Sequence, residues 1–388
     1  MSIEVRPQEE DAEPGGVIVD PNAEAAPAAE SVPPPRRWSS LVPSRKQAFM
    51  AGGLVLIALL PLLFGDSRDF AFFVGQYGAV YAMIGLSIVI VTGYAGLISL
   101  MPYSFAGIGA VVTGAAMASW GWPFWLAMPV AGLATLPVSL LVGIASVRLK
   151  GLYLAIATLT FANALGETFF RWERATGGSN GWLVERPDLG PLGFTSDLAF
   201  YVLCLAFVLV LVWMIEGLRT SRIGRAMLAV KDNELEAQAI GINVYKTKLA
   251  AFALSGIVAG IGGAFLAVLL SSVTPTAFQS PLAESTSILL LVWVVIGGIN
   301  RSLGAFFGGL ALVVQQQVFA GAECFFSFFG VYSAALLILF LLYRPGGLMQ
   351  VGQIMGGLVR WRPAIGIAVI VGTLALNIGG AFFFVNVC

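Results

Sequence analysis

The chain contains no histidine and only three cysteines, and charged residues make up just 11% of its 388 residues. Without an imidazole group, a Ser-His-Asp or Cys-His nucleophile pair, a histidine proton relay and the usual kinds of zinc site are excluded. Cys204, Cys324 and Cys388 lie far apart and form no CxxC motif, so they indicate neither a disulfide framework nor a metal cluster. We interpret them as small apolar packing residues and expect no catalytic or metal-binding residues in this chain.

A phosphate-binding lysine is also missing. A P-loop requires a glycine directly before its lysine, and none of the five lysines here follows a glycine. The chain is therefore not expected to hydrolyse ATP by that route, and our expectation for the whole chain is a transport subunit that is not an enzyme and binds no cofactor. The formal net charge is zero, so no overall electrostatic attraction points to nucleic acid as a partner.

Apolar residues, by contrast, make up 58% of the chain and gather in runs long enough to cross about 30 Å of hydrocarbon. The sequence therefore predicts an all-α fold, a polytopic transmembrane helical bundle of about 10–11 spans in the lipid bilayer. The candidate spans are residues 49–64, 70–91, 105–121, 124–147, 151–169, 199–216, 248–271, 285–299, 303–321, 325–343 and 364–386.

Composition divides the chain into three segments. Residues 1–44 are acidic and rich in Pro and Ala, with almost no large apolar residues, which predicts a disordered tail. The tail lacks the basic start of a signal peptide, so the first apolar run is interpreted as an uncleaved anchor. Residues 45–348 are predicted to form the transmembrane domain, and residues 349–388 form a C-terminal extension with one more candidate span.

The distribution of basic residues predicts the orientation. With a cytoplasmic N-terminus and every run crossing, the interior loops and flanks next to the spans receive sixteen basic residues and the exterior four, as the positive-inside rule requires. Those inside are Arg36, Arg37, Arg45, Lys46, Arg148, Lys150, Arg219, Arg222, Arg225, Lys231, Lys246, Lys248, Arg301, Arg344, Arg360 and Arg362; those outside are Arg68, Arg171, Arg174 and Arg186. One span more or fewer before the loop at 217–248 would reverse the placement of that loop.

The loop at 217–248 is the longest basic segment between apolar runs, and its centre predicts a short helix. Asn233 is a good N-cap, Glu236 three residues later completes a capping box, and Gly241 supplies a C-terminal stop that can take the left-handed conformation. We interpret this helix as a cytoplasmic docking element.

Two glycine-rich segments interrupt the simple pattern of apolar spans. Residues 92–110 carry four glycines and Pro102, which predicts either a re-entrant segment surrounded by protein or a cytoplasmic hairpin between two helices. The glycines of 256–265 have spacings that let helices approach closely, and we interpret them as packing residues.

Five motifs form an ordered set. They are GLYLAIATLTFA at 151–162, TGGSNGW at 176–182, SRIGRAMLAVKDNELEAQAIGINVYKTKLAAF at 221–252, VIGGINRSLGAFFGG at 295–309 and YRPGGL at 343–348. In this order they resemble the permease subunit of branched-chain amino acid ABC importers, and the resemblance covers about 85–348. It implies a permease in the bacterial cytoplasmic membrane that pairs with a second, homologous permease, with ATP-binding subunits and with an extracytoplasmic solute-binding protein.

The resemblance also assigns roles to residues. Glu236, Ala237 and Gly241 match the positions at which importer permeases engage their ATPase, and the coupling loop so defined also includes Arg222, Gly224, Arg225 and Asn233. Relatives commonly have Gly-His where this chain has Met101-Pro102, which leaves the identity of the solute open. The span after Arg362 lies beyond the usual end of the family.

Polar residues suggest a pathway and an outer contact. Thr158, Thr160 and Asn163 lie in one apolar span and either line the pathway or form hydrogen bonds within and between helices. The outer loop with Gly178, Ser179 and Asn180 either contacts a partner or is a flexible connector.

The functional expectation is an ATP-driven importer of branched-chain or related amino acids that works by alternating access. The alternatives are a urea, amide or other small-solute permease of the same family, and, from another class, an ion-coupled carrier or a passive channel. An ion-coupled carrier usually places acidic residues or histidine within its spans. Here Glu167, Glu216, Glu284 and Glu323 lie near predicted span ends, which favours the importer.

Overall fold

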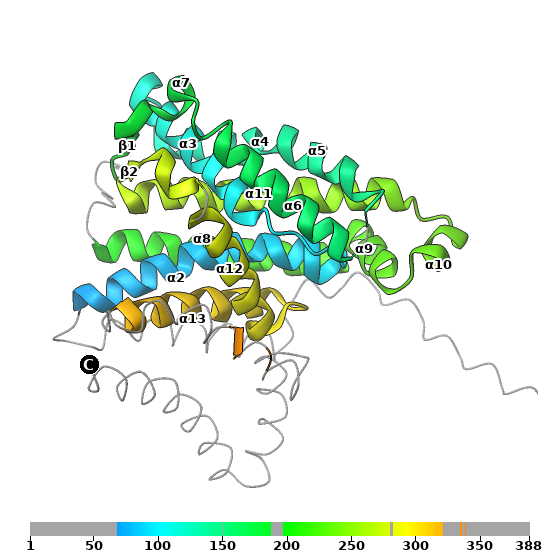
Figure 1. Ribbon diagram of the computed structural model, residues 1–388. Helices are drawn as coiled ribbons and strands as arrows, with labels where there is room; N and C mark the ends of the chain where they lie inside the picture. Colours follow the sequence, from blue (N-terminus) through cyan, green and yellow to red (C-terminus); the bar gives the residue numbers. More distant parts are fainter. Residues whose placement is uncertain are drawn as a thin grey trace, which may run out of the picture. The chain divides into compact units, whose positions relative to one another are not determined.

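The computed structural model describes residues 68–149, 151–187, 197–279, 282–320, 334–335 and 338, and its elements lie in the unit Ile57–Cys388. Most of the described residues are helical (Figure 1). The larger helices are α2 (Arg68–Ile88), continued by the π-helix η2 (Val89–Tyr94), α3 (Pro102–Trp120), α4 (Phe124–Ala134), α5 (Leu136–Ser146), α6 (Leu152–Glu167), α8 (Asp197–Thr220), α9 (Arg222–Asp232), α11 (Val244–Leu270), α12 (Leu282–Gly298) and α13 (Ser302–Ala320). The shorter elements are α7 (Glu173–Thr176), η3 (Gly178–Asn180), β1 (Trp182–Leu183), α10 (Glu234–Ala239), β2 (Ser272–Val273) and η5 (Pro275–Phe278).

The predicted all-α helical bundle is confirmed, and each predicted span between 70 and 321 corresponds to a helix or a pair of helices. Among the described residues, four helical stretches are long and apolar enough to cross a membrane: Phe73–Tyr94, Phe124–Ser146, Asp197–Thr220 and Val244–Leu270. The helices Leu152–Glu167 and Ser285–Gly298 are apolar but shorter. The predicted runs 49–64, 325–343 and 364–386 and the tail 1–44 lie outside the described elements, so the total of 10–11 spans stays a prediction.

Helix α11 packs against α2, α3, α4 and α5, and its glycines explain how it can contact so many neighbours. A Cβ atom on Gly263 would lie 1.9 Å from the carbonyl oxygen of Ala106 in α3, and one on Gly260 would lie 2.9 Å from the carbonyl oxygen of Ala131 in α4. Small residues allow this approach of helix backbones, which in a membrane is stabilised by van der Waals packing. The packing role predicted for these glycines is therefore confirmed.

Helix α2 is the second centre of packing. It contacts α8, α11 and α13, while α12 packs mainly on α13. Gly309 of α13 approaches the backbone of Ala82, and Gly85 of α2 faces Val294 and Ala305. The core thus combines small residues at the helix crossings with aliphatic and aromatic side chains, of which Phe105, Phe252 and Phe265 are fully buried.

The long helices run between two ends of this unit. At one end, which we call the basic end, lie η2, the short helices α9 and α10 and the turn between α12 and α13; at the other, the β end, lie α7, η3 and the antiparallel pair β1–β2 (Figure 1). The 24 residues of α8 separate the two ends by about 36 Å at 1.5 Å per residue. The loop at 217–248 and the segment 176–182 therefore lie at opposite ends, as predicted.

The segment 92–110 forms a turn between two helices at the basic end. The π-helix η2 ends at Tyr94, residues 95–101 are irregular, and α3 begins with Pro102 at its first position. The backbone N–H of Leu100 is satisfied by the hydroxyl of Thr158, 3.1 Å away. Residues 101–110 are buried inside the bundle, and the choice between a re-entrant segment and a cytoplasmic hairpin stays a prediction.

Candidate functional site

The loop between α8 and α11 begins with the amphipathic helix α9. Its N-cap is Ser221, whose hydroxyl accepts a hydrogen bond from the backbone N–H of Gly224 at 3.1 Å. A Cβ atom on Gly224 would lie 2.0 Å from the carbonyl oxygen of Leu218, so only glycine lets α9 turn this sharply from the end of α8. Met227 and Val230, on the inner face of α9, are buried, and their packing holds α9 against the unit.

Asn233 is the N-cap of α10, as predicted, but the Glu236 carboxylate accepts its hydrogen bond from a different donor than expected. The Asn233 side-chain oxygen accepts from the backbone N–H groups of Leu235 (3.0 Å) and Glu236 (3.4 Å). The Glu236 carboxylate accepts from the side-chain amide of Asn233 at 2.7 Å, not from its backbone N–H. That N–H donates to the carbonyl oxygen of Ala229 and so closes α9. The reciprocal half of the capping box is therefore replaced by a side-chain pair.

Gly241 ends α10 in the left-handed conformation, with φ of 85°. The backbone N–H of Ile242 donates to the carbonyl of Ala237, and that of Gly241 donates to the carbonyl of Gln238, both at 2.9 Å. These two bonds form a Schellman motif, and Ile242 packs on the cluster that contains Ala237, as that motif favours. The predicted left-handed stop is confirmed.

A small apolar cluster joins the two loop helices to the start of α11. It consists of the buried residues Val230, Ala237 and Val244, with Ala229 and Ile242 packed against it. Of the predicted coupling residues, Ala237 thus faces inward. Arg222, Arg225 and Glu236 are exposed, and one guanidinium N–H of Arg225 donates to the carbonyl of Thr220 at 2.7 Å.

An ion pair fixes α10 to α11, and the sequence patterns did not indicate it. The Lys248 ammonium lies 2.7 Å from the Glu234 carboxylate, and only 1% of the Lys248 side chain is exposed, against 25% for Glu234. The two residues lie on different helices joined by a turn, so helical spacing alone does not pair them. A burial signal was available, because Lys248 begins a strongly apolar run.

This pair predicts an asymmetric effect of removing each partner. Glu234→Ala leaves a buried ammonium without its carboxylate and is expected to destabilise the docked loop by about 1–3 kcal/mol. Lys248→Met removes the buried charge itself and leaves a carboxylate that water can reach, so it should cost less. Proteolysis rates within the loop of the purified protein measure the difference, with Glu236→Ala as the exposed acidic control. Equal rates for Glu234→Ala and Lys248→Met would contradict the asymmetry.

The outward surface of α10 is apolar at two positions. Leu235 and Ile240 are 75% and 74% exposed, and a shallow pocket next to them is lined by Gln238, Gly241 and residues 242–245. Single exposed apolar side chains are common on protein surfaces and do not by themselves mark an interface; the distinguishing feature of α10 is that its opposite face is anchored to the unit. The loop therefore combines a rigid attachment with a free surface.

The three predicted pathway residues do not come together on one surface. Thr158 is buried; its hydroxyl donates to the carbonyl of Ala155 at 2.9 Å and accepts from Leu100. Thr160 is exposed and donates to the carbonyl of Ile156, while Asn163 is half-buried. Thr158 has a structural hydrogen bond between α6 and the turn before α3, and a pathway role for the three residues stays a prediction.

The segment with Gly178, Ser179 and Asn180 is held firmly at the β end. It forms η3, the hydroxyl of Ser272 donates to the carbonyl of Asn180 at 3.4 Å, and Trp182 pairs with Val273. A Cβ atom on Gly181 would lie 2.3 Å from the carbonyl oxygen of Val273. These contacts favour a packed surface over a flexible connector, and a role in partner contact stays a prediction.

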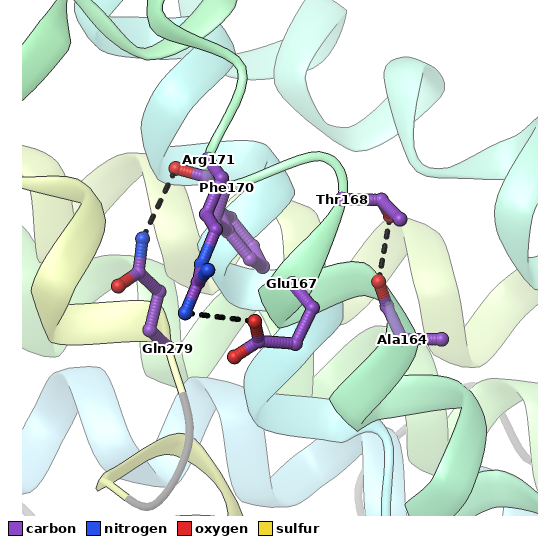
Figure 2. A network of polar contacts seen from close by, with 6 residues as sticks. All are labelled: Ala164, Glu167, Thr168, Phe170, Arg171 and Gln279. Atoms are coloured by element: carbon purple, nitrogen blue, oxygen red, sulfur yellow. Dashed lines mark hydrogen bonds and ion pairs between the residues drawn. The ribbon is translucent and has the colours of Figure 1, made fainter.

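Next to this segment, the end of α6 is joined to the residue that follows η5 (Figure 2). The side-chain amide of Gln279 donates to the carbonyl of Phe170 at 3.4 Å, and Thr168 donates to the carbonyl of Ala164 at 2.6 Å. Arg171 pairs with Glu167 at 2.8 Å, with both side chains about half exposed. Glu167 is thus a solvated carboxylate at a helix end, as interpreted from the sequence.

Comparisons with known proteins agree on one family. Residues 70–342 match the family described as the permease component of the branched-chain amino acid transport system. The chain is 28% identical over 298 residues to the high-affinity branched-chain amino acid transport system permease protein LivM of Escherichia coli (strain K12), covering 70% of this chain and 68% of LivM.

More distant relatives are also permeases. The chain is 26% identical over 267 residues to the ribose import permease protein RbsC of Haemophilus influenzae, covering 67% of this chain and 80% of RbsC. It is 30% identical over 133 residues to the permease protein LivH of Escherichia coli (strain K12), covering 34% of this chain and 41% of LivH. No solved structure matches the chain.

Proposed function

Because the chain belongs to the family of permease components of branched-chain amino acid transport systems, we propose that it moves branched-chain or related amino acids inward across the bacterial cytoplasmic membrane by alternating access. The energy would come from ATP bound and hydrolysed by separate subunits. The observation that carries this proposal is the loop between α8 and α11, which is fixed to the spans on one face and exposed on the other.

The loop can transmit movement because α9 and α10 behave as one body. The apolar cluster around Ala237 and the ion pair Glu234–Lys248 hold the short helices to α11. The absence of a side chain at Gly224 lets α9 pack closely against the end of α8. If ATPase subunits bind α10 through Leu235 and Ile240, their closure would move α10 and, with it, α8 and α11. Since α11 packs on four other helices, this shift would reach the centre of the unit.

The proposed partners follow from the position of α10 at the basic end and of the segment 178–180 at the β end. ATP-binding subunits would dock on α10, and an extracytoplasmic solute-binding protein would dock on the β end, where the segment 178–180 lies. A second, homologous permease would complete the pathway. The resemblance of this chain to both LivM and LivH of one organism supports a pair of related permeases.

An ion-coupled carrier is the rival from another class. Such carriers usually place ionisable side chains inside the bundle as ion ligands or proton relays. Among the described residues, Lys248 is the one charged residue classed as buried, and it lies at the basic end in a pair with Glu234. Glu216 lies near the same end, where it accepts from the hydroxyl of Ser302 at 3.1 Å and lies 3.5 Å from Arg219. This distribution favours a pathway driven by its partners.

Solute-stimulated ATP hydrolysis tests the proposal and the solute together. The chain is purified in complex with its partner subunits, and hydrolysis is measured with leucine, with urea and with ribose, the last because of the similarity to RbsC. Stimulation by leucine is expected, and the chain freed of its partners should show no hydrolysis. Stimulation by urea or ribose alone would show that the substrate is not a branched-chain amino acid. Hydrolysis by the isolated chain would show that ATP hydrolysis does not require separate subunits.

The orientation yields a separate prediction. Asn180 and Lys246 are exposed and lie at opposite ends, so single cysteines at these positions in a cysteine-free background should react with an impermeant thiol reagent from opposite faces of the membrane. Asn180→Cys should react in intact cells, and Lys246→Cys only after the cells are opened, because basic loops stay inside. Labelling of both positions in intact cells would overturn the topology.

A further inference from the structure

Lys231, in the last turn of α9, reaches two parts of the chain that are remote in sequence. Its ammonium donates to the carbonyl oxygen of Gly93 at 2.7 Å and to the side-chain oxygen of Asn300 at 2.8 Å. Gly93 lies in η2, at the end of α2, and Asn300 lies in the turn between α12 and α13. One side chain therefore joins the loop to the end of α2 and to the turn between α12 and α13.

Lys231 is exposed, but the stem of its side chain lies against the backbone at Gly96. A Cβ atom on Gly93 would lie 2.1 Å from the carbonyl oxygen of Ile299, and one on Gly96 would lie 2.8 Å from Cγ of Lys231. Desolvation is the main cause that lowers the pKa of Lys231 from its ordinary value, with Arg219 acting in the same direction and Asp232 opposing it. The ammonium is thus partly withdrawn from water among backbone atoms and acts as more than a solvated surface charge.

The carbonyl of Gly93 is suited to receive this ammonium. It lies in the last turn of η2, where helix carbonyls lack partners within the helix and carry the negative end of the helix dipole. A lysine there satisfies a carbonyl and complements the dipole. Asn300 supplies the second acceptor at a position where α12 has ended and α13 has not begun.

From this geometry we propose that Lys231 is a positioning residue that ties the docking loop to the ends of α2 and of the α12–α13 pair, so that movement of the loop is passed to these helices. The proposal rests on the proposed function, in which the loop is moved by ATPase subunits. The chain connects α9 and α10 directly only to α8 and α11. Apolar helix contacts permit sliding, whereas two charge-assisted hydrogen bonds from one ammonium fix the relative position of the elements.

The test compares transport with ATP hydrolysis in the complete complex. Lys231→Met keeps the length of the side chain but removes the donor, and it should lower the ratio of solute moved to ATP hydrolysed by about tenfold, the factor expected for losing one or two charge-assisted hydrogen bonds. Lys231→Arg, which keeps charge and donors, should restore most of the ratio. The matched control is Lys246→Met, because Lys246 is exposed like Lys231 but makes no side-chain hydrogen bond or ion pair within the described residues.

Asn300→Ala provides a second variant outside the loop. It removes one acceptor without touching α9 or α10, should lower the ratio by a smaller factor, and should add little when combined with Lys231→Met. If the Lys231→Met complex fails to assemble, Asn300→Ala alone tests whether the hydrogen bonds of Lys231 are needed for coupling. The proposal would be contradicted by a wild-type ratio of solute moved to ATP hydrolysed in both Lys231→Met and Asn300→Ala. An equal loss of this ratio in Lys246→Met would also contradict it. Absence of ATP-driven transport in the wild-type complex would instead overturn the proposed function.

Discussion

Gly241→Val is expected to leave insertion and folding of the spans intact while reducing solute transport by about tenfold or more. Gly241 has φ of 85°, a conformation that costs a residue with a Cβ roughly 1–2 kcal/mol. A Cβ atom there would meet nothing within 4 Å, so the expected effect is backbone strain and not a steric clash. Relief of the strain would break the bonds to Ala237 and Gln238 that end α10, and the docking helix would lose its defined position.

Gly121→Val is the matched control for this change. Gly121 ends α3 at the β end with φ of 63°, and a Cβ atom there also meets nothing within 4 Å. It should therefore suffer a similar local strain without affecting the coupling between ATP hydrolysis and transport. Ser271, at the far end of α11, looks neutral in the sequence but has φ of 57°, and replacing it with a β-branched residue would add strain of its own.

Transport and solute-stimulated hydrolysis should be measured side by side in both valine variants, on complexes whose composition has been checked. Two outcomes fit the account for Gly241→Val: poor assembly with the ATPase, or hydrolysis without movement of solute. Wild-type values for both activities in an intact Gly241→Val complex would show that the end of α10 does not matter for coupling.

Gly263→Val is expected to have the largest effect on the fold. Its Cβ atom would lie 1.9 Å from the carbonyl oxygen of Ala106 and 2.8 Å from the Ala106 Cα atom, so relief requires the backbones of α3 and α11 to separate. Overpacking of a core costs typically 1–3 kcal/mol, and more where no side chain can move aside. Because α11 also packs on α2, α4 and α5, the separation would disturb the whole unit. We expect the variant to lose most of its monodisperse, folded protein in detergent.

Gly217→Val controls for a β-branched residue within a long helix. Gly217 lies in α8, is exposed, and has no atom within 4 Å of a Cβ position. Size-exclusion profiles and thermal unfolding should be near wild type for Gly217→Val and strongly altered for Gly263→Val. A Gly263→Val protein with the wild-type profile and melting temperature would show that the close contact of α3 with α11 is not needed for folding.

Local features of the loop could be predicted from the sequence because short-range interactions determine them. Asn233 as N-cap and Gly241 as left-handed stop depend on residues within one helical turn. For Glu236 the partner residue Asn233 was predicted correctly, but the donor group was predicted wrongly, because the donor is the side-chain amide and not the backbone N–H. The pattern does not reveal that another helix ends directly before Asn233 and uses its backbone N–H.

Long-range pairs could not be predicted in the same way. Lys231 and Gly93 are 138 residues apart, and a backbone carbonyl carries no sequence signal that marks it as an acceptor. The pair Glu234–Lys248 joins the first residue of α10 to the second turn of α11, and spacing rules within one helix do not apply between two helices. Likewise, the hydroxyl of Thr158 could not be assigned to Leu100 without knowing that the turn before α3 lies against α6.

Uptake of leucine into proteoliposomes that contain the complete complex, with the solute-binding protein on the β side and ATP on the basic side, tests the central claim most directly. The account predicts uptake that requires ATP, persists when an uncoupler abolishes ion gradients and fails in Gly241→Val. Uptake that an imposed ion gradient drives without ATP, and that an uncoupler abolishes while ATP is held constant, would contradict it.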